Sequence, residues 1–144
     1  QGIFGPSFDY YAIRERRREL VRERLAQYGL EKKPGVEETL RFLRAKGIKT
    51  AVATATALDI TKSHLTTIGV CDLFDSIVSA KNGVRPQDCM AVEDSPNGIM
   101  AAYRAGLRTV MVPDLTQPDE ELTKYLYACV NSLSDLCELV DKED

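Results

Sequence analysis

Apolar residues follow two alternating patterns along the chain, one typical of strands and one typical of helices. Short runs rich in Val, Ile and other apolar residues are typical of strands buried on both faces. Between these runs, apolar positions repeat every three to four residues, which predicts amphipathic helices. We expect strands at 48–54, 74–79, 89–93, 109–112 and 127–130, and helices at 10–29, 36–46, 58–68, 96–105, 119–126 and 133–140.

The alternation of strands and helices predicts the fold class. Consecutive strand–helix–strand units cross over right-handed and build a parallel sheet that is covered by helices on both faces. We therefore expect an α/β protein with a doubly wound, Rossmann-like parallel sheet. Ligands of such sheets bind beyond the carboxyl ends of the strands, which directs attention to the residues after Val52 and Val92.

The helix expected at 10–29 carries six arginines and three glutamates on its polar face. Glu15 and Arg18 are three residues apart, as are Glu19 and Arg22, so each pair can form an ion pair on the helix surface. We interpret this face as solvated and locally paired. The alternative is a surface that binds an anion or a partner.

Composition excludes several classes of protein. With 144 residues, 44% hydrophobic and 28% charged, the chain has the make-up of one soluble domain. A net charge of −3 and the lack of an aromatic stacking pattern beside the charges argue against nucleic-acid binding. No apolar run reaches the roughly 18 residues of a membrane span, and no secretory leader is visible, so we expect a cytoplasmic protein. The chain begins with Gln1, so we expect its natural start to lie elsewhere; oligomeric state leaves no signal in the sequence.

The four cysteines are widely spaced, and the single histidine, His64, lies far from three of them. A structural zinc site needs closer pairs of ligands. We expect free thiols buried in apolar surroundings, with a disulfide or a reactive thiol as the alternative. The four are Cys71, Cys89, Cys129 and Cys137.

Small and hydroxyl residues follow the first expected strand, just before a helix. Small side chains leave backbone N–H groups accessible, and a helix N-terminus carries a partial positive charge. This pattern predicts a phosphate site formed by the Thr54 hydroxyl and the Ala55 amide, with Thr56 as a weaker candidate. The alternative is that Thr54 or Thr56 only caps the helix.

Two adjacent carboxylates, Glu93 and Asp94, follow the strand expected at 89–93. Ser95 and Pro96 come next and are typical of a helix N-cap and first turn. Neighbouring carboxylates repel each other unless a cation neutralises them, and Mg²⁺ prefers oxygen ligands. We therefore predict a Mg²⁺ site with Glu93 and Asp94 as ligands, directly at about 2.1 Å or through water. The alternative is an interaction with the helix dipole at the surface.

A phosphate site at one strand end and a metal site at another together favour phosphoryl chemistry. Here the segments 33–56 and 84–113, the second including EDSPNGIMAAYRAG, resemble the haloacid dehalogenase-like superfamily. Within it they are similar to the branch of sugar-phosphate phosphatases and β-phosphoglucomutases. The resemblance implies that Thr54 binds the transferring phosphoryl group and that Glu93 and Asp94 hold Mg²⁺.

The resemblance also implies how the chain is divided. Residues 1–33 are similar to the last helix of a helical cap domain and its return to the core, and residues 34–144 are similar to the α/β core. Gly98 would let the helix after the acidic turn pack closely. On this division the chain carries only a remnant of the cap, which in this branch selects the substrate.

The chain departs from the family pattern in two places. The family's nucleophile is the first aspartate of an Asp-x-Asp motif on the opening strand, and the 144 residues contain no such motif. The family's lysine has only Lys81 as a counterpart, in Ala-Lys-Asn-Gly; it is a weak candidate for binding phosphate and is otherwise a surface lysine.

The connection over residues 79–88 also indicates that a segment is lacking. Two neighbouring parallel strands need a crossover of about a dozen residues or more, and this connection is shorter. We therefore expect the opening strand and one crossover to be lacking, which would leave a gap between the strands that end at Thr54 and Asp94, with unpaired edges. The length is then that of part of a larger enzyme.

Together these features predict a Mg²⁺-dependent phosphatase or phosphomutase that acts on a small phosphorylated metabolite such as a sugar phosphate. The alternative is a catalytically inert domain of the same fold, which binds a phosphorylated ligand or a partner protein without turnover. The absent Asp-x-Asp motif favours the alternative, and the intact acidic turn at Glu93 favours the enzyme. The sequence does not distinguish hydrolase from mutase or identify the substrate.

Overall fold

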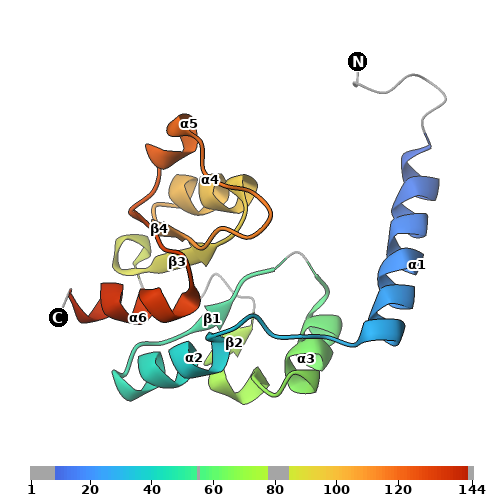
Figure 1. The fold of residues 1–144 in the computed structure, drawn as a ribbon, viewed down its shortest axis with the longest axis horizontal. Coiled ribbons are helices and arrows are strands. Elements are labelled where there is room, and N and C mark those ends of the chain that lie inside the picture. Colours follow the sequence, from blue (N-terminus) through green and yellow to red (C-terminus); the bar gives the residue numbers. More distant parts are fainter. Residues whose placement is uncertain (1–8, 55, 78–84, 143–144) are drawn as a thin grey trace. The chain divides into compact units, whose positions relative to one another are not determined.

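The computed structural model describes residues 9–54, 56–77 and 85–142, and the chain divides into two units, 1–31 and 32–144. The first unit contains α1 (Tyr10–Tyr28), and the second contains all other elements (Figure 1). These are α2 (Val36–Ala45), β1 (Ala51–Val52), α3 (Leu58–Thr67), the 3₁₀ turn η1 (Cys71–Leu73), β2 (Ser76–Ile77), the 3₁₀ turn η2 (Pro86–Asp88), β3 (Met90–Glu93), α4 (Pro96–Arg104), β4 (Arg108–Met111), α5 (Glu120–Thr123), β5 (Ala128–Cys129) and α6 (Leu133–Asp141).

Helix α1 begins and ends as the sequence predicts. The Asp9 side chain caps its first turn by accepting a hydrogen bond from the Ala12 amide at 3.0 Å. Gly29 follows the last residue with φ of 73°, a left-handed conformation that glycine adopts without steric cost. The predicted helix at 10–29 is therefore confirmed to within one residue.

The surface of α1 is charged and exposed. Arg18 pairs with Glu15 at 2.6 Å, which confirms the first predicted ion pair. The second prediction was wrong, because Glu19 pairs instead with Arg16, at 3.1 Å on the preceding turn. No residue of α1 is buried, and its apolar residue Ile13 is 53% exposed, so the expected apolar stripe covers nothing within this unit.

The second unit contains two parallel sheets. β1 pairs with β2, with Ala51 opposite Ser76, and β4 lies between β3 and β5. Strands alternate with helices except between β2 and β3, where the described residues contain only the 3₁₀ turn η2, and the predicted α/β class with parallel strands is confirmed. The described strands form two sheets rather than one continuous sheet. Several strands are shorter than predicted; the strand expected at 48–54 is regular only over β1, the part that pairs with β2.

The second unit has two separate apolar clusters. In the first, buried Leu40 from α2 contacts Val70 and Leu73, with Val36 and Phe74 at the margin. In the second, Ile99 from α4, Met111 from β4 and Leu122 from α5 pack together. Helix α4 therefore lies against β3 and β4 through a residue that is fully removed from solvent.

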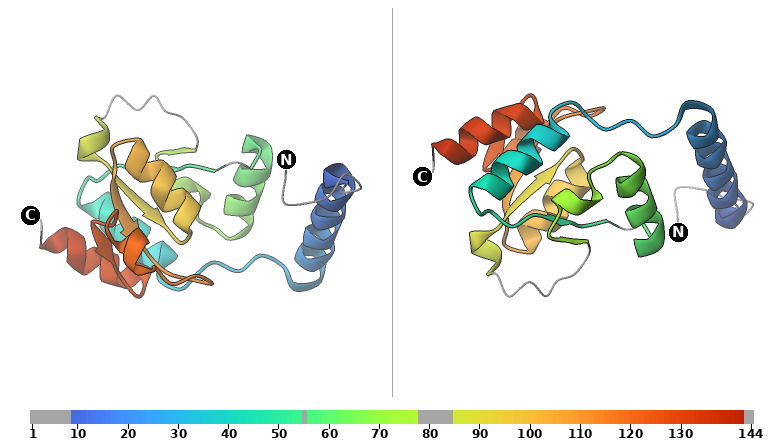
Figure 2. Two further views of the ribbon diagram at one scale, coloured as in Figure 1. Left: turned by 90° about the horizontal axis from the view of Figure 1, so that it is seen from above. Right: turned by 90° about the horizontal axis from the view of Figure 1, so that it is seen from below.

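Helices α2 and α6 join the two halves of the second unit, and Figure 2 shows them side by side. The Thr39 hydroxyl donates to the Leu133 carbonyl at 2.9 Å, and Lys46 pairs with Asp141 at 2.7 Å. Thr39 is buried although it is polar, and this hydrogen bond satisfies its hydroxyl. Through these contacts α6, which follows β5 of the second sheet, is attached to α2, which precedes β1 of the first sheet.

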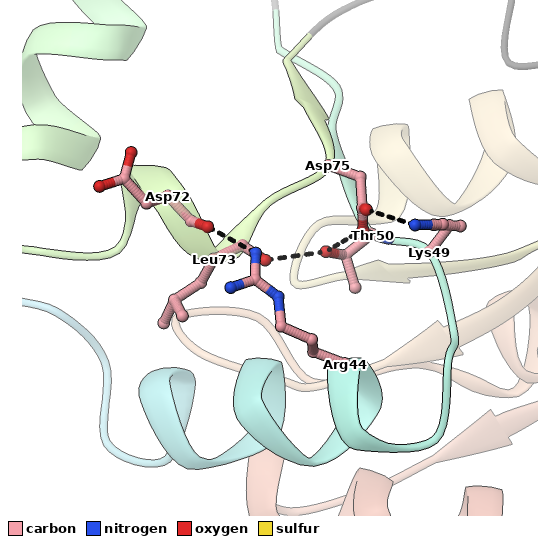
Figure 3. Close-up of polar contacts among 6 residues, drawn as sticks. All are labelled: Arg44, Lys49, Thr50, Asp72, Leu73 and Asp75. Carbon is pink, nitrogen blue, oxygen red and sulfur yellow. Dashed lines mark hydrogen bonds and ion pairs between the residues drawn. The ribbon is translucent and has the colours of Figure 1, made fainter.

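A polar cluster ties together the chain segments that enter β1 and β2, opposite the strands' carboxyl ends (Figure 3). The Asp75 carboxylate accepts from the Thr50 amide at 2.9 Å and pairs with Lys49 at 2.9 Å. The Thr50 amide, and secondly Lys49, hold the pKa of Asp75 below its usual range. The Arg44 guanidinium donates to the Asp72 carbonyl. These contacts fix the pairing of β1 with β2 at its start.

The cysteines are free, as predicted, and all four lie in the described residues. The expectation that they are buried was wrong, because Cys129 is exposed and the other three are half-buried. Cys129 ends β5, an edge strand of its sheet, where the described residues provide only one neighbouring strand. Within the described part of the chain, no helix is long and apolar enough to cross a membrane.

Candidate functional site

The first candidate region follows β1, where the chain turns toward α3. The Thr54 hydroxyl oxygen accepts a hydrogen bond from the Thr56 amide at 3.1 Å, which closes a short turn. The hydroxyl hydrogen of Thr54 stays available as a donor, since a hydroxyl both donates and accepts. Thr54 is half-buried and Thr56 is exposed. Of the predicted phosphate ligands, Ala55 and Lys81 lie outside the described residues.

The N-terminus of α3 lacks a capping side chain. Ala57 occupies the N-cap position, where it offers no side-chain acceptor to the first amides of the helix. The alternative interpretation, in which Thr54 or Thr56 caps α3, is therefore wrong: the Thr54 hydroxyl binds the Thr56 amide, before the helix begins. Buried Thr61 fastens this end of the helix by donating to the Ala57 carbonyl at 3.1 Å. The amides of the first turn are thus unsatisfied by side chains and suited to an anion.

The second candidate region follows β3, where the acidic pair leads into α4. Ser95 is the N-cap of α4, and its hydroxyl accepts from the Gly98 amide at 3.2 Å. Pro96 occupies the first turn, so the predicted cap and proline are confirmed. One oxygen of Glu93, Oε2, accepts from the Asp94 amide at 3.0 Å, the Ser95 amide at 3.1 Å and the Ser95 hydroxyl at 3.0 Å.

The two carboxylates of the pair differ in their surroundings. Glu93 is half-buried and engaged with the turn, whereas Asp94 is exposed. Among the described residues, the Asp94 carboxylate has no hydrogen-bond or ion-pair partner. Carboxylate oxygens suit Mg²⁺, but no cluster of three or more His, Cys, Asp or Glu side chains able to hold a metal is found in the part of the chain that the structure describes. The pair fits Mg²⁺ if water or phosphate oxygens complete its coordination.

The structure places the two candidate regions at the carboxyl ends of strands in different sheets. Thr54 lies two residues after β1, and Glu93 is the last residue of β3. Among the described residues, no hydrogen bond or ion pair joins the Thr54 turn to the Glu93 turn. Each region is therefore formed locally, by its own strand and the helix that follows.

One contact at a strand's carboxyl end was not predicted. Asp114 lies three residues after β4 and pairs with Lys33 at 2.6 Å, in the segment before α2. The signal in the sequence is an acidic residue close behind a predicted strand, the same signal that marks Asp94. This ion pair holds the segment that leads into α2 against the loop after β4.

Comparison with known proteins identifies the family. A model of haloacid dehalogenase-like hydrolases matches residues 7–106. The chain is 31% identical to the "Probable pseudouridine-5'-phosphatase" of Drosophila melanogaster, covering 90% of this chain and 64% of that protein. It is 30% identical to hexitol phosphatase B of Escherichia coli, covering 76% of this chain and 56% of that protein. The chain thus spans between about half and two thirds of the length of these relatives.

A solved structure shows the same fold and places the chain within the family. The β-phosphoglucomutase of Clostridium difficile superposes with a TM-score of 0.61 at 26% identity, over 76% of this chain and 54% of that one. This likeness agrees with the similarity of the chain to the two phosphatases. The chain belongs to the haloacid dehalogenase-like hydrolases, in the branch of β-phosphoglucomutases and sugar-phosphate phosphatases.

Proposed function

We propose that the protein to which this chain belongs is a Mg²⁺-dependent enzyme that transfers a phosphoryl group from a small phosphorylated metabolite such as a sugar phosphate. The observation that carries the proposal is the exposed carboxylate of Asp94 at the carboxyl end of β3, which no described side chain or amide engages. The relatives support it, because those named above as phosphatases act on a hexitol phosphate and a pseudouridine phosphate by name.

Each candidate residue has a role in this proposal. Mg²⁺ bound at Asp94 would neutralise the negative charge that develops on the phosphoryl oxygens. The Thr54 hydroxyl would donate a hydrogen bond to a phosphoryl oxygen, and the uncapped amides at the start of α3 would orient the same group. Thr56 shapes the turn through its amide. Ala55 and Lys81 stay predicted phosphate ligands from the sequence.

We propose that the nucleophile implied by the family resemblance lies in residues other than these 144. In the described residues β1 pairs with β2 alone and β3 with β4 alone, so each has an edge to which a further strand can bind. The alignment with the Drosophila relative has 153 positions, more than this chain has residues, so that relative contains residues without a counterpart here. A strand that carries the Asp-x-Asp motif is therefore proposed between β1 and β3.

A second candidate is a binding domain of the same fold without turnover. The observation that favours it is the absence of an Asp-x-Asp motif from the 144-residue sequence. Such a domain would bind a phosphorylated ligand at Thr54 and α3 without transferring the group. The two candidates differ in whether phosphate is released.

The test is release of phosphate from an aryl phosphate, and then from hexitol phosphates and pseudouridine 5′-phosphate, with and without Mg²⁺. Intact mass is measured first, since a mass well above 16.0 kDa reveals further residues. We expect Asp94→Asn to lower kcat/KM by about a hundredfold or more, because it removes a charged ligand of the metal.

The matched control is Asp72→Asn, an exposed aspartate in η1 before β2, which should retain the wild-type rate. Equal rates in Asp94→Asn and wild type would refute the metal assignment. A protein of 16.0 kDa that binds phosphorylated ligands without releasing phosphate would favour the binding domain.

A further inference from the structure

Thr61 is a polar residue in the interior, near the start of α3. It is only 7% exposed, and a buried hydroxyl is unfavourable unless it forms a hydrogen bond. The Thr61 hydroxyl donates to the Ala57 carbonyl at 3.1 Å and to the Thr56 carbonyl at 3.5 Å. Its single hydrogen is therefore shared between two neighbouring acceptors. Both acceptors lie in the segment that joins the Thr54 turn to α3.

The two acceptors differ in their other hydrogen bonds. The Ala57 carbonyl also accepts from the Thr61 amide at 2.9 Å, the usual first hydrogen bond of a helix. Among the described residues, the Thr56 carbonyl has only the Thr61 hydroxyl as a donor. The Thr56 amide donates to the Thr54 hydroxyl oxygen at 3.1 Å. Threonine hydroxyls therefore hold both polar backbone groups of Thr56, one from each side.

These contacts bear on the direction in which the Thr54 hydroxyl donates. A hydroxyl that accepts one hydrogen bond keeps its own hydrogen for another acceptor, and the position of the first donor fixes which side that hydrogen faces. The donor here is the amide of Thr56, an exposed residue whose backbone is held from the interior by Thr61. A fixed Thr56 thus gives the Thr54 hydroxyl a fixed direction.

We propose that Thr61 is a positioning residue for phosphate binding: its hydroxyl holds Thr56, and Thr56 aims the Thr54 hydroxyl at a phosphoryl oxygen. Thr61 is buried and acts only through Thr56. A donor that is oriented before the anion arrives loses less free energy on binding it. This inference deepens the proposed function and rests on it for the role of Thr54.

The first experiment is titration calorimetry of the intact protein with inorganic phosphate at a fixed Mg²⁺ concentration, which needs no turnover. Thr61→Val removes the hydroxyl and retains the branched shape, so phosphate should bind about fivefold more weakly. Thr61→Ser retains the hydroxyl and should bind phosphate within about twofold of wild type, although the loss of a buried methyl group lowers its melting temperature. A residue that only supported the fold would not be rescued by serine in this way.

The matched control is Thr67→Val on the same helix. The Thr67 hydroxyl also donates to a backbone carbonyl four residues earlier, that of Ser63 at 2.9 Å, but it lies at the other end of α3. Its loss should leave phosphate affinity within about twofold of wild type. The control therefore separates the position of the hydroxyl from the general effect of removing one from this helix.

The second experiment is a double-mutant cycle that tests whether Thr61 acts through Thr54. Thr54→Val should weaken phosphate binding by about tenfold or more, because it removes a hydrogen bond to a charged acceptor. In the Thr54→Val background, Thr61→Val should weaken binding by less than about twofold, since the donor that it aims is gone. Equal losses from Thr61→Val in the two backgrounds would overturn the proposal.

The outcomes separate this inference from the proposed function. Equal phosphate affinities of Thr61→Val and Thr67→Val overturn the positioning role, even when the wild type releases phosphate from its substrates. A wild-type protein that binds no phosphate also overturns it. Phosphate binding with the expected cycle, in a protein that releases no phosphate from any substrate, supports the positioning role and refutes the proposed enzyme.

Discussion

Truncation of Ile99 tests whether α4, the helix that carries the acidic turn, is held by the second apolar cluster. Ile99 is fully buried against Met111 and Leu122. Ile99→Ala removes three carbon atoms, each worth about 0.8 kcal/mol in transfer free energy, and leaves a cavity that adds to the loss. We expect the free energy of unfolding to fall by about 3 kcal/mol, and by about 1 kcal/mol for Ile99→Val.

The measurement is equilibrium unfolding in urea, with thermal unfolding as a check. For a protein of this size about 3 kcal/mol corresponds to a fall of about 12 °C in melting temperature. The matched control is Ile60→Ala on α3, where the same side chain is 46% exposed and its loss should change stability by less than about 0.5 kcal/mol. If Ile99→Ala and Ile60→Ala have equal effects, or if Ile99→Val is as damaging as Ile99→Ala, the packing of α4 described here is wrong.

Two further predictions concern α2. A hydrogen bond from Lys32, with a second from Arg41, lowers the pKa of Glu37 from 4.5 to about 2. The stability that ionised Glu37 contributes is therefore fully present above about pH 4.5 and is lost as pH falls toward 2. Across this pH range the melting temperature should fall less for Glu37→Gln than for wild type. Parallel melting-temperature curves for the two proteins would contradict the assignment. Gly35 and Gly47 flank α2 with φ of 81° and 72°, so alanine at either position should cost about 1–2 kcal/mol. In urea unfolding, Gly35→Ala should lower the free energy of unfolding more than Gly47→Ala does. The new Cβ at position 35 would lie 2.8 Å from the Ser134 hydroxyl oxygen, whereas the space beside Gly47 is open. Equal losses in the two variants would exclude that clash.

The ends of helices were readable from the sequence because they depend on local chemistry. Gly29, Gly47 and Gly69 lie at or next to the predicted helix ends, and each has a positive φ within two residues of the last helical residue. Strand lengths were less predictable, because a strand extends only as far as its neighbour pairs with it. The strand expected at 48–54 is regular at two residues, those that face β2. The apolar side chains of α1 are a second example. Their spacing predicts the helix, but it does not show which surface, if any, covers them, and in this unit they are exposed.

The residue types in the sequence predicted where the candidate site lies, but they did not predict the hydrogen bonds within it. Adjacent carboxylates after a strand and hydroxyls after another strand marked the two turns by their position in an α/β chain. Which oxygen of Glu93 the backbone amides engage depends on the path of the turn, which residue types do not specify. The sequence shows that Gly98 follows Glu93 closely, but only the structure shows that the Glu93 carboxylate fills the space that a side chain at position 98 would need.

The contact between α2 and α6 sets the order in which this chain can fold as it is synthesised. Thr39 and Leu133, which share a hydrogen bond across the two helices, are 94 residues apart. When the first sheet leaves the ribosome, α6 has not yet been synthesised. Helix α2 therefore cannot make its contact with α6 until α6 emerges. During that interval the α2 surface that α6 later covers is open to chaperones, and a chain shortened before α6 would keep it open permanently.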